Sequence, residues 1–134
     1  MNEQDYLEEL MERLSCVRCH DKLKYDLFSI LAKSGQEGKF LGVLLTALQI
    51  LRIHGTDAIY VRRRLFEKLS HEAALFSMRV NLPQVNCRIL YTFFRGEPVL
   101  LYGFWERQGH RKTDYSSAIK IARSRMDEWR AKYE

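Results

Sequence analysis

The stretch CRILYTFFRGEPVLLYGFW, residues 87–105, predicts a β-hairpin and thereby the fold class of the chain. Residues 87–94 are rich in aromatic and β-branched side chains, which are enriched in strands. Arg95, Gly96 and Glu97 form the expected turn. Pro98 opens the second strand, a position that tolerates proline, and residues 99–105 complete the hairpin.

A third strand precedes this hairpin. Residues 75–80 show the period of two that is typical of a strand. The strand would carry Phe76, Met78 and Val80 on one face and Leu75, Ser77 and Arg79 on the other. Residues 81–86 contain Pro83 and are expected to form a loop. The sequence therefore predicts three consecutive strands in an antiparallel meander.

Helical periodicity dominates the part of the chain before these strands. Residues 5–17 carry one apolar stripe with acids on the opposite face, and residues 39–54 form an apolar helix that ends at Gly55. Asp21 is expected to cap a helix over residues 21–33, although an alternating strand through Leu23, Tyr25 and Leu27 is an alternative. The helices at 21–33 and 39–54 predict an αα-hairpin, and residues 56–70 a connector.

A final helix is expected from residue 114 or 116 to the end. Its apolar stripe consists of Ala118, Ile119, Ala122, Met126, Trp129 and Tyr133. Helices that precede an antiparallel sheet indicate the α+β class. We predict a single domain, residues 1–134, with N-terminal helices, a three- to four-stranded antiparallel sheet and a C-terminal helix.

The composition favours a globular protein of the cytoplasm. Apolar residues make up 46% and charged residues 29% of the 134 residues, which excludes a disordered chain. The most apolar run, residues 40–53, is too short for a bilayer span of about 20 residues, so no membrane is expected as a partner. Residues 1–14 lack the pattern of a signal peptide, and the three cysteines are expected to be reduced.

The stretch CVRCH, residues 16–20, has the C-x-x-C-H spacing of a c-type haem attachment site. Zinc needs four ligands, and the chain has no second pair at metal-ligand spacing. Redox use of C-x-x-C requires a preceding strand, whereas a helix is expected there. We therefore interpret Cys16 and Cys19 as thiols at a helix end and predict neither metal nor cofactor, with haem as the weakest alternative.

Charge is distributed unevenly along the chain, whose formal net charge is +5. Residues 1–14 hold five acids and one base (net −4), while residues 79–134 hold eleven bases and six acids (net +5). This predicts a polyanion-binding surface in the C-terminal half. Scattered surface charge is the alternative.

Four stretches in this order resemble the RelE/HigB-like toxins of bacterial toxin–antitoxin pairs, particularly the phage-derived HigB-like branch. They are ALQILRIHG (residues 47–55), LFSMRV (75–80), CRILYTFFRGEPVLLYGFWER (87–107) and KTDYSSAIKIARSRMDEW (112–129). The resemblance implies a RelE-like domain over residues 21–134, with residues 1–20 as an N-terminal extension. It also implies metal-independent cleavage of mRNA, often on the ribosome, silenced by an antitoxin for which a helix-turn-helix protein is expected.

Three arginines are the expected phosphate contacts. In such a reaction the 2′-hydroxyl of the RNA attacks the adjacent phosphate, and negative charge builds on the phosphoryl oxygens. Arginine suits this charge because its planar fork pairs two oxygens. Arg79, Arg88 and Arg107 come from three adjacent strands, and Arg79 and Arg88 match basic positions of the family. Arg107 alternatively ends its strand in solvent.

The loop and helix start after the third strand supply the other candidates. Imidazole ordinarily titrates near neutrality, so His110 is the candidate for proton transfer, unless it is simply a solvent-exposed loop histidine. Tyr115 matches a family tyrosine that stacks on a base or acts as acid or base. Arg111, Lys112 and the basic run Arg62, Arg63 and Arg64 are expected to bind RNA, Lys112 through phosphate.

The chain departs from the family pattern at three places. Glu106 stands where related toxins often carry lysine, the loop before Lys112 is longer by a few residues, and no clear first strand precedes the helices. We interpret CVRCH as part of the extension, with a degenerate first strand. The acidic helix ahead of it either docks near the RNA face and screens it, or its apolar stripe simply covers the core or pairs with another copy of the chain.

Three other functions compete with the ribonuclease. The same fold without catalysis would bind RNA or an antitoxin through its basic face. An unrelated α+β protein and a haem protein are the remaining alternatives.

Overall fold

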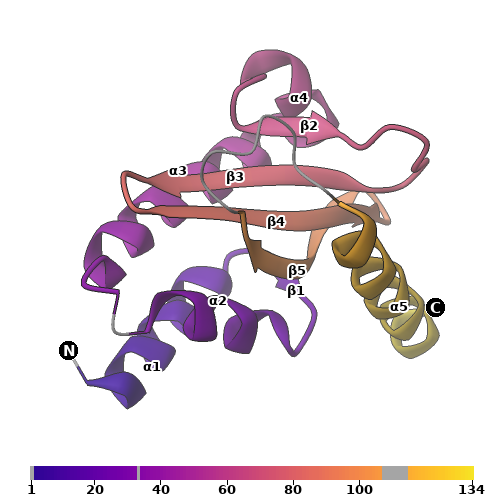
Figure 1. Cartoon of the computed structure of the whole chain (residues 1–134). Coiled ribbons are helices and arrows are strands. Elements are labelled where there is room, and N and C mark those ends of the chain that lie inside the picture. The colour runs from indigo at the N-terminus through magenta and orange to yellow at the C-terminus, as the bar shows by residue number, and fades with distance from the viewer. Residues whose placement is uncertain (1, 33, 107–114) are drawn as a thin grey trace.

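The computed structural model of the protein describes residues 2–32, 34–106 and 115–134, and within them a five-stranded sheet carries helices on both faces (Figure 1). The predicted α+β class is confirmed. The elements are α1 (Glu3–Leu14), β1 (Arg18–Cys19), α2 (Leu23–Leu31), α3 (Glu37–His54), the 3-10 turn η1 (Gly55–Asp57), α4 (Ala58–Val61), β2 (Phe66–Lys68), β3 (Phe76–Leu82), β4 (Val85–Phe94), β5 (Glu97–Trp105) and α5 (Ser116–Tyr133).

The sheet has the strand order β1-β5-β4-β3-β2, and only the β1–β5 pair is parallel. The predicted meander is confirmed as β3, β4 and β5. The predicted loop at residues 81–86 is wrong, because both strands continue and only Pro83 and Gln84 lie between them. The physical reason is burial, since Leu82 and Val85 are 9% and 6% exposed.

Two short strands, β1 and the unpredicted β2, enlarge the sheet from the predicted three or four strands to five. β2 lies within the expected connector, where Phe66 is buried and pairs with Met78. β1 lies within CVRCH, as the degenerate first strand was expected to, and pairs Arg18 and Cys19 with β5. The N–H of His20 extends this pairing by donating to the carbonyl of Leu100 at 2.8 Å.

The turn between β4 and β5 is confirmed at Arg95 and Gly96. Their φ angles are 53° and 82°, so both residues are left-handed. Two successive left-handed residues are typical of a two-residue hairpin turn whose twist matches the strands.

A β-bulge in β5 decides which side chains face α5. Leu100 pairs with Tyr91 and Tyr102 pairs with Leu90, so Leu101 is an additional residue on β5. Leu101 and Tyr102 therefore both pack on the α5 side of the sheet. A bulge of this kind re-aims every later side chain of its strand.

The helices divide between the two faces. α1, α2 and α3 cover one face, whose core includes Tyr6, Leu10 and Leu14 of α1, and α5 covers part of the other through Ala118, Ala122 and Trp129 (Figure 1). The predicted αα-hairpin is wrong as a packing unit, because α2 and α3 each contact α1 more extensively than they contact each other. None of the helices in residues 2–32, 34–106 and 115–134 is long and apolar enough to cross a bilayer.

β1 pairs only with Val99 and Leu100 of β5, and the side chains of Asp26 and Arg125 cover the edge of β5 that follows. The Arg125 guanidinium contacts both carboxylate oxygens of Asp26, at 2.5 and 3.1 Å, and donates to the carbonyl of the bulged Leu101 at 2.9 Å. Asp26 also accepts from the N–H of Gly103 at 3.2 Å. One side chain from α2 and one from α5 thus satisfy edge groups that would otherwise be open to another strand.

The start of α2 differs from the prediction. Lys22 is its N-cap residue and no side chain caps it. The carboxylate of Asp21, the expected cap, lies 3.4 Å from the ammonium of Lys132 on α5 instead.

Gly103 allows α2 to approach the sheet closely. A Cβ at this position would lie 2.7 Å from Cδ2 of Leu27, whose side chain is fully buried. We expect Gly103→Ala to destabilise the fold by about 1–3 kcal/mol because the core is overpacked. The measurement is urea unfolding followed by circular dichroism.

Gly42→Ala is the matched control. Gly42 lies inside α3 with no atom within 4 Å of an added Cβ, so the same change should stabilise the helix by about 0.5–1 kcal/mol. Equal effects of the two substitutions would contradict the close approach of α2 and β5.

Candidate functional site

A polar cluster lies on the α5 side of the sheet, where Arg79 of β3 and Arg88 of β4 stand directly opposite each other. Their neighbours on the same face are Ser77 of β3 and Glu67 of β2, which also pair with each other across the strands. Two like charges directly opposite destabilise a sheet unless acids compensate them. The cluster therefore depends on nearby carboxylates.

Two carboxylates hold Arg88. Its Nε donates to Oε2 of Glu106 at 2.6 Å, and its Nη1 donates to Oε1 of Glu67 at 3.1 Å. The Arg88 side chain is only 7% exposed, compared with 18% for Glu106 and 46% for Glu67. A buried cation is tolerated when it is paired and hydrogen-bonded in this way.

Tyr115 joins the cluster from the position just before α5. Its hydroxyl donates to Oε1 of Glu67 and lies 3.3 Å from Oγ of Ser77, and its ring packs edge-on against Phe104. Burial and the contact with Glu67 raise the pKa of Tyr115 to about 12. The hydroxyl therefore stays protonated at neutral pH and donates a hydrogen bond to Glu67.

Arg79 differs from Arg88 in its partners. Its Nε is buried without a hydrogen-bond partner, and no acidic side chain in residues 2–32, 34–106 and 115–134 forms an ion pair with Arg79. A buried donor left unpaired is costly, so such a group calls for an explanation. Its charge remains available for an anion.

The structure thus brings together Arg79, Arg88 and Tyr115, three of the residues that the sequence predicted. Arg107, His110, Arg111 and Lys112 lie outside the described residues. Arg62, Arg63 and Arg64 are exposed in the segment between α4 and β2, and no contact with the cluster is seen among the described residues.

Glu67 was missed by sequence reasoning. It lies on β2, a three-residue strand within a stretch expected to be a connector. The sequence signal for this strand was one apolar residue, Phe66, followed by one polar residue, Glu67. A single alternation of this kind is too short to identify a strand.

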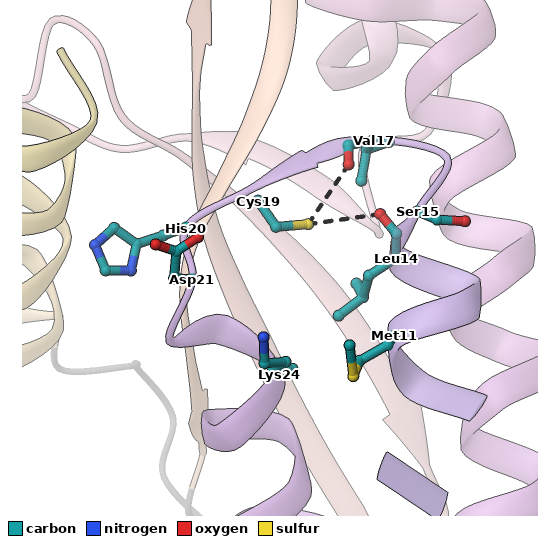
Figure 2. Close-up of a pocket in the computed structure, with 8 residues that line it drawn as sticks. All are labelled: Met11, Leu14, Ser15, Val17, Cys19, His20, Asp21 and Lys24. Carbon is teal, nitrogen blue, oxygen red and sulfur yellow. Dashed lines mark hydrogen bonds between the residues drawn. The ribbon is translucent and has the colours of Figure 1, made fainter. Parts of the chain in front are cut away.

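The CVRCH residues do not converge on one point. Cys19 and His20 both line a pocket beside α1 and the start of α2 (Figure 2). The Nε2 of His20 lies 2.9 Å from Oε2 of Glu128 on α5, while the thiol of Cys19 lies near the carbonyls of Leu14 and Val17. Burial raises the pKa of the Cys19 thiol to about 12, which opposes the thiolate that a zinc ligand requires. Within the described part of the chain no group of three or more His, Cys, Asp and Glu residues is placed to hold a metal.

α1 does not lie over the Arg88 cluster, so the hypothesis that α1 screens this candidate site is wrong. Tyr6, Leu10 and Leu14 of α1 belong to the core beneath α3, on the face of the sheet opposite the Arg88 cluster. The alternative, that the apolar stripe of α1 covers the core, is confirmed.

Comparison with known proteins gives no relative from which to infer function. No family model matches the chain, and neither a curated protein nor a solved structure is similar to it.

Arg88 is expected to stabilise the fold as well as the site. Arg88→Ala removes the cation shared by Glu67 and Glu106, and we expect it to lower the free energy of unfolding by about 1.5–3 kcal/mol. The measurement is urea unfolding at neutral pH.

Arg18→Ala is the matched control. The Arg18–Glu97 pair is 50% and 60% exposed, so its loss should cost less than about 1 kcal/mol. If Arg88→Ala proves no more harmful than Arg18→Ala, the guanidinium does not hold the cluster together.

Proposed function

We propose that the chain is an endoribonuclease of the RelE/HigB-like toxin kind, which cleaves mRNA in the cytoplasm without a metal and is silenced by an antitoxin. The observation that carries this proposal is the carboxylate of Glu67, which joins Arg88 and Tyr115 next to Arg79, the residue directly opposite Arg88. These three residues were selected from the sequence for this chemistry, and they come from different elements. The ribosome as the site of cleavage and a helix-turn-helix antitoxin follow from the family resemblance.

Glu67 is the proposed general base. Cleavage begins when the 2′-oxygen of the RNA forms a bond to the adjacent phosphorus and loses its proton. Glu67 is suited to accept that proton because its side chain is 46% exposed and its Oε1 is held by Arg88 and Tyr115. These two contacts hold the carboxylate in one orientation, which a positioned base requires.

Arg79 is the proposed phosphate contact. The phosphoryl oxygens gain negative charge as the 2′-oxygen attacks, and the Arg79 guanidinium has no acidic partner within the described residues. A cation prepositioned for that charge stabilises the transition state without reorganisation. Arg88 acts through Glu67 and Glu106 and is a positioning residue.

The second proton goes to the leaving 5′-oxygen as its bond to phosphorus breaks. The raised pKa of Tyr115 favours a role in orienting Glu67 and makes the hydroxyl a poor acid at neutral pH. His110 is the proposed donor on the sequence argument that imidazole titrates near neutrality.

A binding module without catalysis is the second candidate. The four charged side chains Arg79, Arg88, Glu67 and Glu106 sum to zero, so they present no net positive charge to a phosphate. Such a balance favours a site that binds RNA or an antitoxin weakly through surrounding cations.

Cleavage of a single-stranded RNA in the presence of a chelator tests the ribonuclease. We expect Glu67→Gln and Arg79→Ala each to slow cleavage roughly 100- to 1000-fold, since each removes one contact to the reacting groups. Arg79→Lys should restore only part of the rate because it lacks the planar fork. The exposed-pair variant Arg18→Ala should cleave at the wild-type rate.

The outcomes separate the two candidates. RNA binding without cleavage by the wild type identifies the binding module, whereas cleavage that survives both Glu67→Gln and Arg79→Ala removes the proposed site. A protein that neither binds nor cleaves RNA contradicts both functions.

A further inference from the structure

An exposed tyrosine and three exposed arginines form a surface between α3 and β2. Ala58 is buried and Ile59 packs on the core, so the single turn of α4 leaves Tyr60 68% exposed. Arg62, Arg63 and Arg64 follow directly and are exposed. We call Tyr60, Arg62, Arg63 and Arg64 the α4 surface.

The charge of the α4 surface is not compensated. Among the described residues no acidic side chain forms an ion pair with these three arginines, and the side chain of Arg62 contacts only the carbonyl of Val61, at 3.3 Å. Three adjacent cations beside one open aromatic ring are the combination by which proteins hold single-stranded nucleic acid.

The α4 surface is fixed to the strand that carries Glu67. The carbonyl of Arg62 accepts from the N–H of Phe66 at 3.0 Å, and the carbonyl of Leu65 accepts from the N–H of Arg79 at 2.7 Å. α4 and β2 lie next to each other at one edge of the sheet (Figure 1). A strand of RNA that reaches Glu67 and Arg79 therefore has this surface beside it.

We propose that Tyr60 stacks on a base of single-stranded RNA while Arg62, Arg63 and Arg64 contact its phosphates, next to the nucleotide that is cleaved. This inference rests on the proposed RNA substrate and adds a second binding site to it. The ring face accepts any base, so the α4 surface contributes affinity without sequence preference. Each arginine neutralises a phosphate and makes the affinity dependent on salt.

The competing occupant is an acidic segment of another protein, whose carboxylates would pair with the three arginines. Val61, 41% exposed, would add apolar contact area for such a segment. RNA is favoured by the open tyrosine ring and by the covalent continuity from Arg64 to Glu67, three residues later.

Binding of a labelled single-stranded RNA tests the proposal independently of cleavage. The probe is a fluorescein-labelled oligonucleotide of about 12 nucleotides with 2′-O-methyl riboses, which carries no attacking hydroxyl, and the readout is fluorescence anisotropy. We expect Tyr60→Ala to raise Kd about tenfold and Tyr60→Phe to leave it unchanged, because the ring and not the hydroxyl stacks. Tyr25→Ala is the control, because it removes a tyrosine that is 55% exposed on α2.

Salt dependence tests the arginines. Replacing Arg62, Arg63 and Arg64 together by Gln should make the slope of log Kd against log salt shallower by about 2. A Tyr60→Ala protein that binds as tightly as the wild type, or a wild type that does not bind the probe, overturns the proposal. Probe binding that depends on Tyr60 supports the proposal even if the wild type cleaves no RNA. The binding measurement therefore tests the α4 surface, and the cleavage measurement tests the proposed ribonuclease.

Discussion

The salt bridge between Asp26 and Arg125 is the contact on which the arrangement of the sheet and helices depends most. The two residues come from helices on opposite faces of the sheet and meet at the edge of β5 that β1 leaves open. Their side chains are 13% and 11% exposed, and together they satisfy backbone groups of Leu101 and Gly103. Loss of either partner leaves a buried charge and an open edge.

The position of the polar cluster follows from this contact. Arg125 holds α5 on the bulged strand, and the start of α5 brings Tyr115 to Glu67. Glu67 and Glu106 then compensate Arg88, which allows two arginines to stand opposite each other. The same carboxylates reduce the positive charge that a phosphate would meet, so under the proposed function the stability of the cluster and its affinity for RNA oppose each other.

The long elements were predictable and the short ones were not. The helices α1, α3 and α5 and the strands β3 to β5 repeat their pattern often enough to be recognised, and the predicted meander placed Arg79 and Arg88 on adjacent strands. β1 and β2 are too short to show a period, so Glu67 was missed with its strand. The Asp26–Arg125 pair joins residues 99 positions apart, which no local pattern reveals.

The chemistry of the cleaved ends tests the central claim, that Glu67 and Arg79 direct attack by the 2′-hydroxyl, most directly. Mass spectrometry of a short RNA incubated with the protein and a chelator identifies these ends. The account predicts fragments that end in a 2′,3′-cyclic phosphate and begin with a 5′-hydroxyl, and no cleavage where a 2′-O-methyl group replaces the hydroxyl. Fragments that begin with a 5′-phosphate, or cleavage that persists at the 2′-O-methyl position, would contradict it.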